Sequence, residues 1–342
     1  MVNSDSYRCI VPSVPEGSLR PLWSVMIPTY NCARYLRETL AGVLAQAPGA
    51  EVMQIEVIDD CSTDDDPAAV VAELGRGRAI FYRQKQNVGY IRNFETCLQR
   101  SRGLLVHLLH GDDGVLPGFY YRMQRLFERH PVIGAGFCRH IIMDDDSHWK
   151  RFSRLEQATS GMLENWLERI AVELPLQPPS MVVRRQVYET LGGFDRRMAS
   201  CGEDWEMWTR IAAHYPVGYE VEPLALYRDR ANSLTKRAVR TGQNIQDVRK
   251  ATEITRAYLP PAQMQQLTEK AAEGWAQWAF HFSQQLVAQG DIAGAWVQFL
   301  EGLRCSRSGR SMRLALPLLL KIAKQGLKRA MNSRCTLSNS ST

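Results

Sequence analysis

Two adjacent acidic residues, Asp112 and Asp113, stand at a position in the sequence where their carboxylates could bind a cation. They follow an apolar run at 104–109, bounded by Gly103 and Gly111, which predicts a buried strand. In an open α/β sheet, ligands bind at the carboxyl ends of the strands. Uncompensated acids there are costly unless a cation or a hydrogen-bonding ligand joins them, and hard divalent cations bind carboxylates and phosphates together. A solvated Asp-Gly turn is the alternative for this segment taken alone.

A second acidic pair, Glu203 and Asp204, follows Gly202 and precedes Trp205. We expect both acids in the first turn of a helix whose buried face begins with Trp205. Acids in a first turn are favoured by the helix dipole, so we expect one of them to have a purely capping role. We do not expect both acids to have only that role.

The elements that must position these acids alternate in type. Apolar runs predict strands at 23–27, 54–58, 79–83 and 104–109, with helical segments between them. Such βαβ spacing predicts a mostly parallel sheet with right-handed crossovers. Polar clusters end three of these strands, so we expect them to converge on one edge of the sheet: Thr29-Tyr30-Asn31, Asp59-Asp60 and Asp112-Asp113.

Phosphate-binding glycine motifs are missing from the sequence. No G-x-G-x-x-G follows the first strand, and no G-x-x-x-x-G-K-[ST] occurs anywhere. If a nucleoside diphosphate binds, its charge must therefore be neutralised by a metal and by side chains.

Composition narrows the class of protein. A chain of 342 residues with 45% apolar and 23% charged residues predicts a soluble protein with one large α/β domain and a smaller appendage. The eight cysteines form no C-x-x-C pair, and no N-terminal signal pattern occurs, which indicates a cytoplasmic protein.

Positive charge is concentrated at the C-terminus. Residues 301–342 hold nine Lys or Arg and one acid, Glu301, which gives this segment a charge of +8. Because the net charge of the chain is +6, the remaining residues carry a charge of −2. A nearly neutral body argues against a nucleic-acid groove there. A predicted last helix at 317–331 lacks an apolar run long enough to span a bilayer. It either lies on an anionic membrane surface, peripherally at the inner face of the plasma membrane, or packs on the preceding helices with its lysines in water.

Several motifs, in order and spacing over roughly residues 23–230, resemble the family 2 inverting glycosyltransferases. They are Val25-Met26-Ile27-Pro28-Thr29-Tyr30-Asn31, Val57-Ile58-Asp59-Asp60-Cys61-Ser62-Thr63-Asp64, Asn87-Val88-Gly89 with Arg92-Asn93, Asp112-Asp113, Leu191-Gly192-Gly193-Phe194-Asp195 and Glu203-Asp204-Trp205-Glu206-Met207-Trp208-Thr209-Arg210. The resemblance implies the type A glycosyltransferase fold, a single nucleotide-binding domain with a mixed central sheet. We expect an N-terminal arm at 1–21, a catalytic domain at 22–235, a C-terminal helical region at 236–331 and a disordered tail at 332–342.

The resemblance also implies roles for individual residues. Asp113 would hold the metal, Asp204 would be the general base, and Glu203 and Trp205 would support the acceptor. The nucleotide-sugar contacts would come from Pro28, Tyr30, Asp60, Arg92 and Asp112. We expect Asp59 to brace its loop instead.

Three later segments carry further expectations. The family's metal motif commonly reads Asp-x-Asp-Asp, and His110 stands in its first place here, but the final Asp-Asp pair is intact, so we still expect metal binding. We assign His110 itself no metal role, because one His without a second His at ligand spacing is usually structural. Arg228 and Arg230 lie in a segment that resembles the family's closing loop, from which either could reach phosphate oxygens. Residues 144–146 are three consecutive acids, which we expect to form a solvated loop rather than a metal cluster.

The implied function is metal-dependent transfer of a hexosyl or deoxyhexosyl unit, with Mn²⁺ or Mg²⁺, in surface polysaccharide synthesis. The donor is a nucleoside-diphosphate sugar, with uridine or deoxythymidine favoured by the resemblance, and the acceptor is a saccharide or lipid-linked saccharide hydroxyl. A nucleotidyltransferase is one alternative, although residues 28–34 lack its usual Gly-rich basic loop. A non-catalytic nucleotide-sugar-binding or scaffold protein is the other, prompted by His110.

Overall fold

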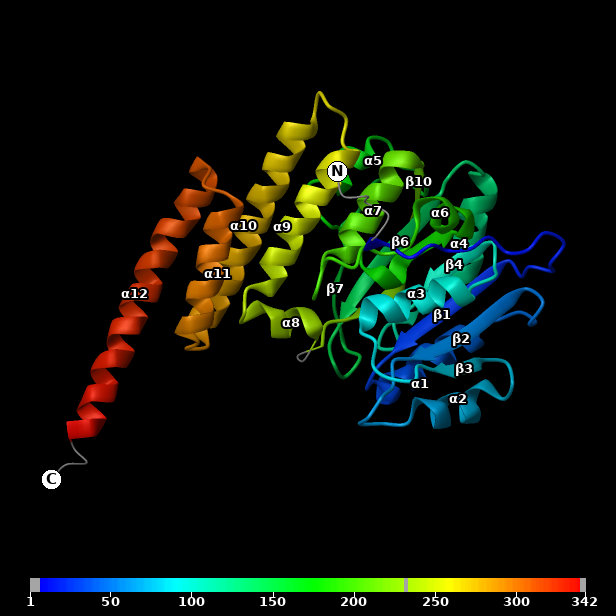
Figure 1. Ribbon diagram of the computed structural model, residues 1–342, viewed down its shortest axis with the longest axis horizontal. Coiled ribbons are helices and arrows are strands. Elements are labelled where there is room, and N and C mark those ends of the chain that lie inside the picture. Colours follow the sequence, from blue (N-terminus) through cyan, green and yellow to red (C-terminus); the bar gives the residue numbers. More distant parts are fainter. Residues whose placement is uncertain (1–6, 231–232, 339–342) are drawn as a thin grey trace. The chain divides into compact units, whose positions relative to one another are not determined.

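The structure is a computed structural model that describes residues 7–230 and 233–338, with side chains as far as residue 327. The chain forms two compact units, shown with their elements in Figure 1. The sheet unit comprises the described residues up to Ile170, together with Leu174–Arg196 and Met207–Arg230. The helical unit comprises Ala171–Glu173, Arg197–Glu206 and the described residues after 230. The domain limits expected from the sequence stay predictions.

A mixed sheet of ten strands, counted over the described residues, organises the sheet unit. Four parallel strands form one half, in the order β3 (Ile80–Arg83), β2 (Met53–Asp59), β1 (Trp23–Thr29) and β4 (Leu105–Leu108). The other half continues with β9 (Met181–Arg184), β6 (Ala135–Met143), β10 (Val217–Arg228) and β5 (Gly114–Val115). Strand β9 runs antiparallel to both β4 and β6, whereas β6 and β10 are parallel. The predicted mostly parallel, mixed sheet is confirmed.

Short strands and helices complete this unit. Strands β7 (Trp149–Phe152) and β8 (Gly161–Met162) pair with β6 and β10. The helices are α1 (Ala33–Leu44), α2 (Pro67–Gly75), α3 (Tyr90–Arg100), α4 (Phe119–Arg129), α5 (Trp166–Ile170), α6 (Arg185–Leu191) and the later part of α7 (Glu203–His214). A short 3₁₀ helix covers Pro178–Ser180. Buried side chains of helices α1, α2 and α4 belong to one apolar core together with those of the fully buried strand β1.

The N-terminal arm is more ordered than its Pro-rich sequence predicts. Arg8 lies 3.5 Å from the buried carboxylate of Asp195, and the Gly193 N–H donates to the Cys9 carbonyl. Cys9 and Val11 are buried. The arm therefore contacts the sheet unit at residues 8–11, while residues 1–6 lie outside the described residues.

The helical unit contains α8 (Leu234–Val239), α9 (Gln243–Thr255), a 3₁₀ turn (Arg256–Tyr258), α10 (Met264–Ala288), α11 (Ile292–Cys305) and α12 (Gly309–Ser338). Its core joins α10, α11 and α12 around Phe280, Phe299 and Ile322. Among the described residues, no helix combines the length and apolarity needed to cross a membrane.

Helix α12 begins earlier than the predicted residue 317. The Ser308 hydroxyl accepts from the Ser311 N–H at 3.2 Å, which is helix-capping geometry. Pro317 lies inside the helix and lacks an N–H, but it and Arg313 are exposed, so water can satisfy the Arg313 carbonyl. The segment from 332 that we expected to be disordered is helical as far as Ser338, and 339–342 lie outside the described residues.

The close approach of β1 to the start of β4 predicts an effect on stability. A Cβ on Gly103 would meet the Ser24 nitrogen and the Trp23 carbonyl carbon at 2.5 Å. We expect Gly103→Ala to lower the free energy of unfolding by about 1 to 3 kcal/mol, because backbone must move to make room. Urea unfolding measures the change. Gly309→Ala is the control, since a methyl group there would stand in open space. Equal stability of the two variants would contradict the prediction.

Candidate active site

The carboxyl ends of β2, β1 and β4 meet at one edge of the sheet, because these strands are adjacent and parallel. Backbone hydrogen bonds join the segments that leave them. The Asp60 N–H donates to the Thr29 carbonyl at 2.9 Å, and the Gly111 N–H donates to the Pro28 carbonyl at 3.0 Å. The polar clusters after these strands are therefore neighbours, as the alternation of elements predicts.

Asp59 and Asp60 both organise loops at this edge. Asp59 is fully buried, accepts from the Ser62 backbone N–H and hydroxyl, and pairs with Arg83 at 2.6 Å, so it braces its loop as expected. Asp60 accepts from the N–H groups of Val88 at 2.8 Å and Gly89 at 3.0 Å. Burial raises the pKa of Asp60, and these two N–H groups oppose the rise. Asp60 thereby fixes the turn that leads into α3.

Three other residues that are predicted to contact the nucleotide sugar differ in how exposed they are. Pro28 is buried in β1 opposite Ile58. Tyr30 is 45% exposed and so has much of its ring open to a ligand. Arg92 is exposed in the first turn of α3. Their contacts with a nucleotide sugar stay predictions.

Asp113 has the features of a metal ligand. Its side chain is 2% exposed, and one oxygen, Oδ1, accepts from the Arg228 backbone N–H at 2.9 Å. Its other oxygen, Oδ2, is buried without a hydrogen-bond partner among the described residues. Burial and the nearby Asp112 raise the pKa of Asp113 well above its usual range, while Arg228 and Arg230 oppose that shift. A cation bound at Oδ2 would satisfy this oxygen and offset the cost of burying the charge.

His110 belongs to the same group of side chains. One ligand atom from each of His110, Asp112 and Asp113 lies within 4.8 Å of the others. The His110 Nδ1 is 3.7 Å from Asp113 Oδ2, which is too long for a hydrogen bond. Two atoms that each bind one cation at about 2.1 Å lie roughly 3 to 3.7 Å apart. The ring of His110 stacks on Phe94, with centroids 5.0 Å apart. The spacing of His110 and Asp113 therefore fits two ligands of one cation, although the sequence pattern assigns His110 no metal role.

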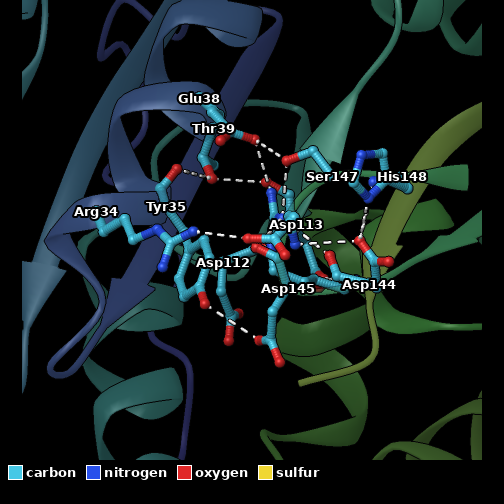
Figure 2. A network of polar contacts seen from close by, with 12 residues as sticks. Arg34, Tyr35, Glu38, Thr39, Asp112, Asp113, Asp144, Asp145, Ser147 and His148 are labelled. Atoms are coloured by element: carbon cyan, nitrogen blue, oxygen red, sulfur yellow. Dashed lines mark hydrogen bonds and ion pairs between the residues drawn. The ribbon is translucent and has the colours of Figure 1, made fainter. Parts of the chain in front are cut away.

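Arg228 fixes the surroundings of the acidic pair, a role that the sequence did not predict. Its side chain is 1% exposed and donates to the carbonyls of Asp112 at 2.9 Å and Asp144 at 3.1 Å. It also pairs with Glu38 of α1 at 2.7 Å. Figure 2 shows Glu38, Asp112, Asp113 and Asp144 together in one network of polar contacts. With its donors engaged in this way, Arg228 is a positioning residue for the acidic pair.

Arg230 has a different setting from Arg228. It lies 3.0 Å from Asp112 Oδ2, and both side chains are about a quarter exposed. Its guanidinium also stands 5.0 Å from the centroid of the Tyr35 ring. Of the two arginines, Arg230 is therefore the better placed to release the Asp112 carboxylate and bind a phosphate group instead.

The three consecutive acids at 144–146 form a turn with internal partners. Asp144 accepts from the N–H groups of Asp146 and His148 and pairs with Lys150 at 2.6 Å, which lowers its pKa. Asp146 pairs with Arg34 on the surface. As expected, this segment has the contacts of a surface loop rather than of a metal cluster.

Asp204 lies in the helical unit, in the first turn of α7. Burial raises its pKa from the ordinary 3.8 to about 6, opposed chiefly by the Trp205 N–H, which donates to it at 2.7 Å. Trp205 is fully buried against Trp275 of α10, with ring centroids 5.0 Å apart, and Glu203 is 8% exposed. The sequence did not predict that Glu206 would accept from the Tyr258 hydroxyl, at 2.7 Å. A carboxylate with a pKa of about 6 can act as a base near neutral pH.

The comparisons with known proteins define the class. The family described as glycosyl transferase family 2 matches residues 24–192, and a second, described as glycosyltransferase like family 2, matches residues 152–259. The chain belongs to glycosyl transferase family 2, as its motifs predict, and the protein is a glycosyltransferase.

Particular proteins are similar to this chain in sequence or in fold. An uncharacterized protein of Mycobacterium tuberculosis is 30% identical over 253 residues, which cover 68% of this chain and 75% of the relative. The crystal structure of S. aureus TarS 1-349 has a TM-score of 0.62 at 16% identity and covers 89% of this chain and 88% of its own. The mannosyltransferase PcManGT from Pyrobaculum calidifontis, in complex with GDP-Man and Mn²⁺, has a TM-score of 0.55 at 19% identity. The match covers 92% of this chain and 89% of the PcManGT chain. At these identities the structural likeness concerns the fold, which is the predicted type A glycosyltransferase fold.

The raised pKa of Asp204 predicts a dependence of stability on pH. Because the folded state binds this proton more tightly than the unfolded chain does, stability is lost as the pH rises from about 4 through about 6. We expect Asp204→Asn to be more stable than the wild type at pH 8, by up to about 3 kcal/mol, and about equally stable at pH 4. Urea unfolding at the two pH values tests this. A variant that is less stable than the wild type at pH 8 would contradict the prediction.

Proposed function

We propose that the protein is a metal-dependent inverting glycosyltransferase. It moves a hexosyl or deoxyhexosyl unit from a nucleoside-diphosphate sugar to a hydroxyl of a saccharide or lipid-linked saccharide. We further propose that it acts in the cytoplasm, in surface polysaccharide synthesis. Membership of glycosyl transferase family 2 supports the reaction class.

The observation that carries the proposal is the buried Oδ2 of Asp113 at the end of β4, which lacks a hydrogen-bond partner among the described residues. Asp112 and His110 lie beside it, and Asp60 and Tyr30 follow the neighbouring strands. In open α/β sheets ligands bind at this edge. We propose that Asp113 holds Mn²⁺ or Mg²⁺, with His110 beside it, and that Asp112 lies near the ribose.

Donor recognition follows from the exposed and polar groups of the same edge. Tyr30 can stack its ring on a base, and Asp60 can accept from a base imide N–H. Arg92 and, once released from Asp112, Arg230 can bind phosphate oxygens. TarS has been crystallised with UDP-GlcNAc and PcManGT with GDP-Man and Mn²⁺. We propose a donor of the same chemical class, with uridine or deoxythymidine as its base.

The reaction is a single in-line displacement. Asp204 accepts the proton of the acceptor hydroxyl as that oxygen forms its bond to the anomeric carbon and the bond to the diphosphate breaks. Glu203 and Trp205 hold Asp204 or the acceptor in position. A bound divalent cation supplies positive charge where negative charge builds on the departing diphosphate. No protein nucleophile takes part, so the configuration at the anomeric carbon inverts.

Removing the buried carboxylate should abolish metal-dependent donor binding. We expect Asp113→Asn to lose the thermal shift that Mn²⁺ adds in a panel of uridine and deoxythymidine diphosphate sugars, and to release nucleoside diphosphate at least about 100-fold more slowly. Asp146→Asn is the control, since its exposed carboxylate pairs with Arg34 on the surface. A variant at Asp113 that keeps its Mn²⁺-dependent shift would refute the metal assignment.

Removing the proposed base should separate binding from turnover. We expect Asp204→Asn to bind the donor with wild-type affinity but to transfer sugar to the acceptor roughly 10²- to 10⁴-fold more slowly. In the wild type, kcat should fall as the pH drops below about 6, where Asp204 becomes protonated. Glu203→Gln should lose less activity and keep this pH profile.

The same measurements test the alternative of a non-catalytic nucleotide-sugar-binding protein, which the exchange at His110 suggests. Such a protein would give a donor-dependent thermal shift but no acceptor-dependent release of nucleoside diphosphate in the wild type.

A further inference from the structure

Helix α12 carries one apolar line that is buried within the helical unit. Ala315, Leu318 and Ile322 are 2%, 5% and 0% exposed and belong to the core shared with α10 and α11. Their spacing of three and four residues places them on one side of the helix. This line accounts for the packing of α12 on the preceding helices.

A second apolar line of α12 is exposed. Leu316, Leu320 and Leu327 are 55%, 72% and 66% exposed, and their spacing of four and seven residues again places them along one line. At about 100° per residue, the centre of this line stands about 150° around the helix from the centre of the buried line. Packing within the helical unit therefore explains the first line and leaves the second open to solvent.

Basic side chains flank the exposed leucines. Arg313, Lys321 and Lys324 are exposed. At about 100° per residue, Arg313 and Lys324 lie about 40° and about 60° from the centre of the leucine line, and Lys321 lies about 120° from it on the same flank. After Glu301 the sequence has nine Lys or Arg and no acid. A second copy of the chain packed on this line would bring like charges together, which disfavours self-association. An occupant with negative charge and apolar depth is favoured instead.

We propose that the exposed face of α12, defined by Leu316, Leu320, Leu327, Arg313, Lys321 and Lys324, docks on an anionic lipid surface. The helix lies in the plane of the interface. Its three leucines enter the boundary between headgroups and acyl chains, and its basic side chains contact anionic headgroups. This inference stands on the helical unit alone and does not depend on the proposed sugar transfer. Such docking would keep the protein at the surface where lipid-linked acceptors are found.

Flotation of the full-length protein with vesicles tests the proposal. We compare neutral phosphatidylcholine vesicles with vesicles that also contain phosphatidylglycerol, at low and high salt. The wild type should float with the anionic vesicles, float less at high salt, and remain unbound with neutral ones. The triple variant Leu316→Ser/Leu320→Ser/Leu327→Ser should bind at least about tenfold more weakly. Lys321→Glu/Lys324→Glu should bind at least about 25-fold more weakly, at about fivefold for each charge.

Matched variants in the sheet unit serve as controls. Leu19→Ser/Leu104→Ser/Leu155→Ser removes three exposed leucines, and Arg122→Glu/Arg129→Glu reverses two exposed charges on α4. Both should float like the wild type, and circular dichroism should show that every variant is folded. Equal binding to neutral and anionic vesicles, or wild-type binding by the triple α12 variant, would overturn the proposal. So would a wild-type dimer, measured by light scattering, that the triple α12 variant converts to a monomer.

Discussion

The buried guanidinium of Arg228 is the interaction on which the acidic pair of the sheet unit depends. The backbone N–H of Arg228 donates to one oxygen of Asp113. The guanidinium of the same residue donates to the Asp112 carbonyl and to the 144–147 loop, and it pairs with Glu38 of α1. The planar guanidinium has five N–H donors in fixed directions, so it can satisfy more acceptors here than the three donors of a lysine ammonium could. Because the last residue of β10 thus holds the loop after β4, the geometry of the site is set by the sheet rather than by the loop's own sequence.

The two Asp-Asp pairs of the edge have different electrostatic environments. Both acids of the first pair are satisfied by the protein: Asp59 by Ser62 and Arg83, and Asp60 by two backbone N–H groups. In the second pair, Asp112 is matched by Arg230, and only Asp113 retains a buried oxygen without a partner among the described residues. This difference explains why one of four similar residues is suited to a cation. Asp60 remains available to a ligand only through its second lone pairs or by releasing the 87–89 turn.

Periodicity and turn residues predict much of this fold because their physics is local. The run 185–191 shows helical spacing and ends at Gly192, and it forms α6 with those bounds. The acidic and polar clusters fall at strand ends because apolar runs and βαβ spacing determine where parallel strands stop. Local signals do not reveal contacts between distant segments. Arg228 pairs with Glu38, and Arg8 with Asp195, across distances in sequence that no spacing rule covers. Pro317 misled the prediction for α12 because its tolerance depends on an exposed face that only packing defines.

The division of the chain has a consequence for biosynthesis. Residues 197–206, which carry Asp204, belong to the helical unit, where Ser200 donates to Asp247 and Trp205 packs on Trp275. A nascent chain emerges from its N-terminus, so the partners of this segment leave the ribosome well after the segment itself. The strands of the sheet can pair first, whereas the surroundings of Asp204 are completed only when α9 and α10 have been translated. A chain whose translation ends soon after β10 could therefore form its sheet, but it would lack the tertiary contacts that bury its proposed base.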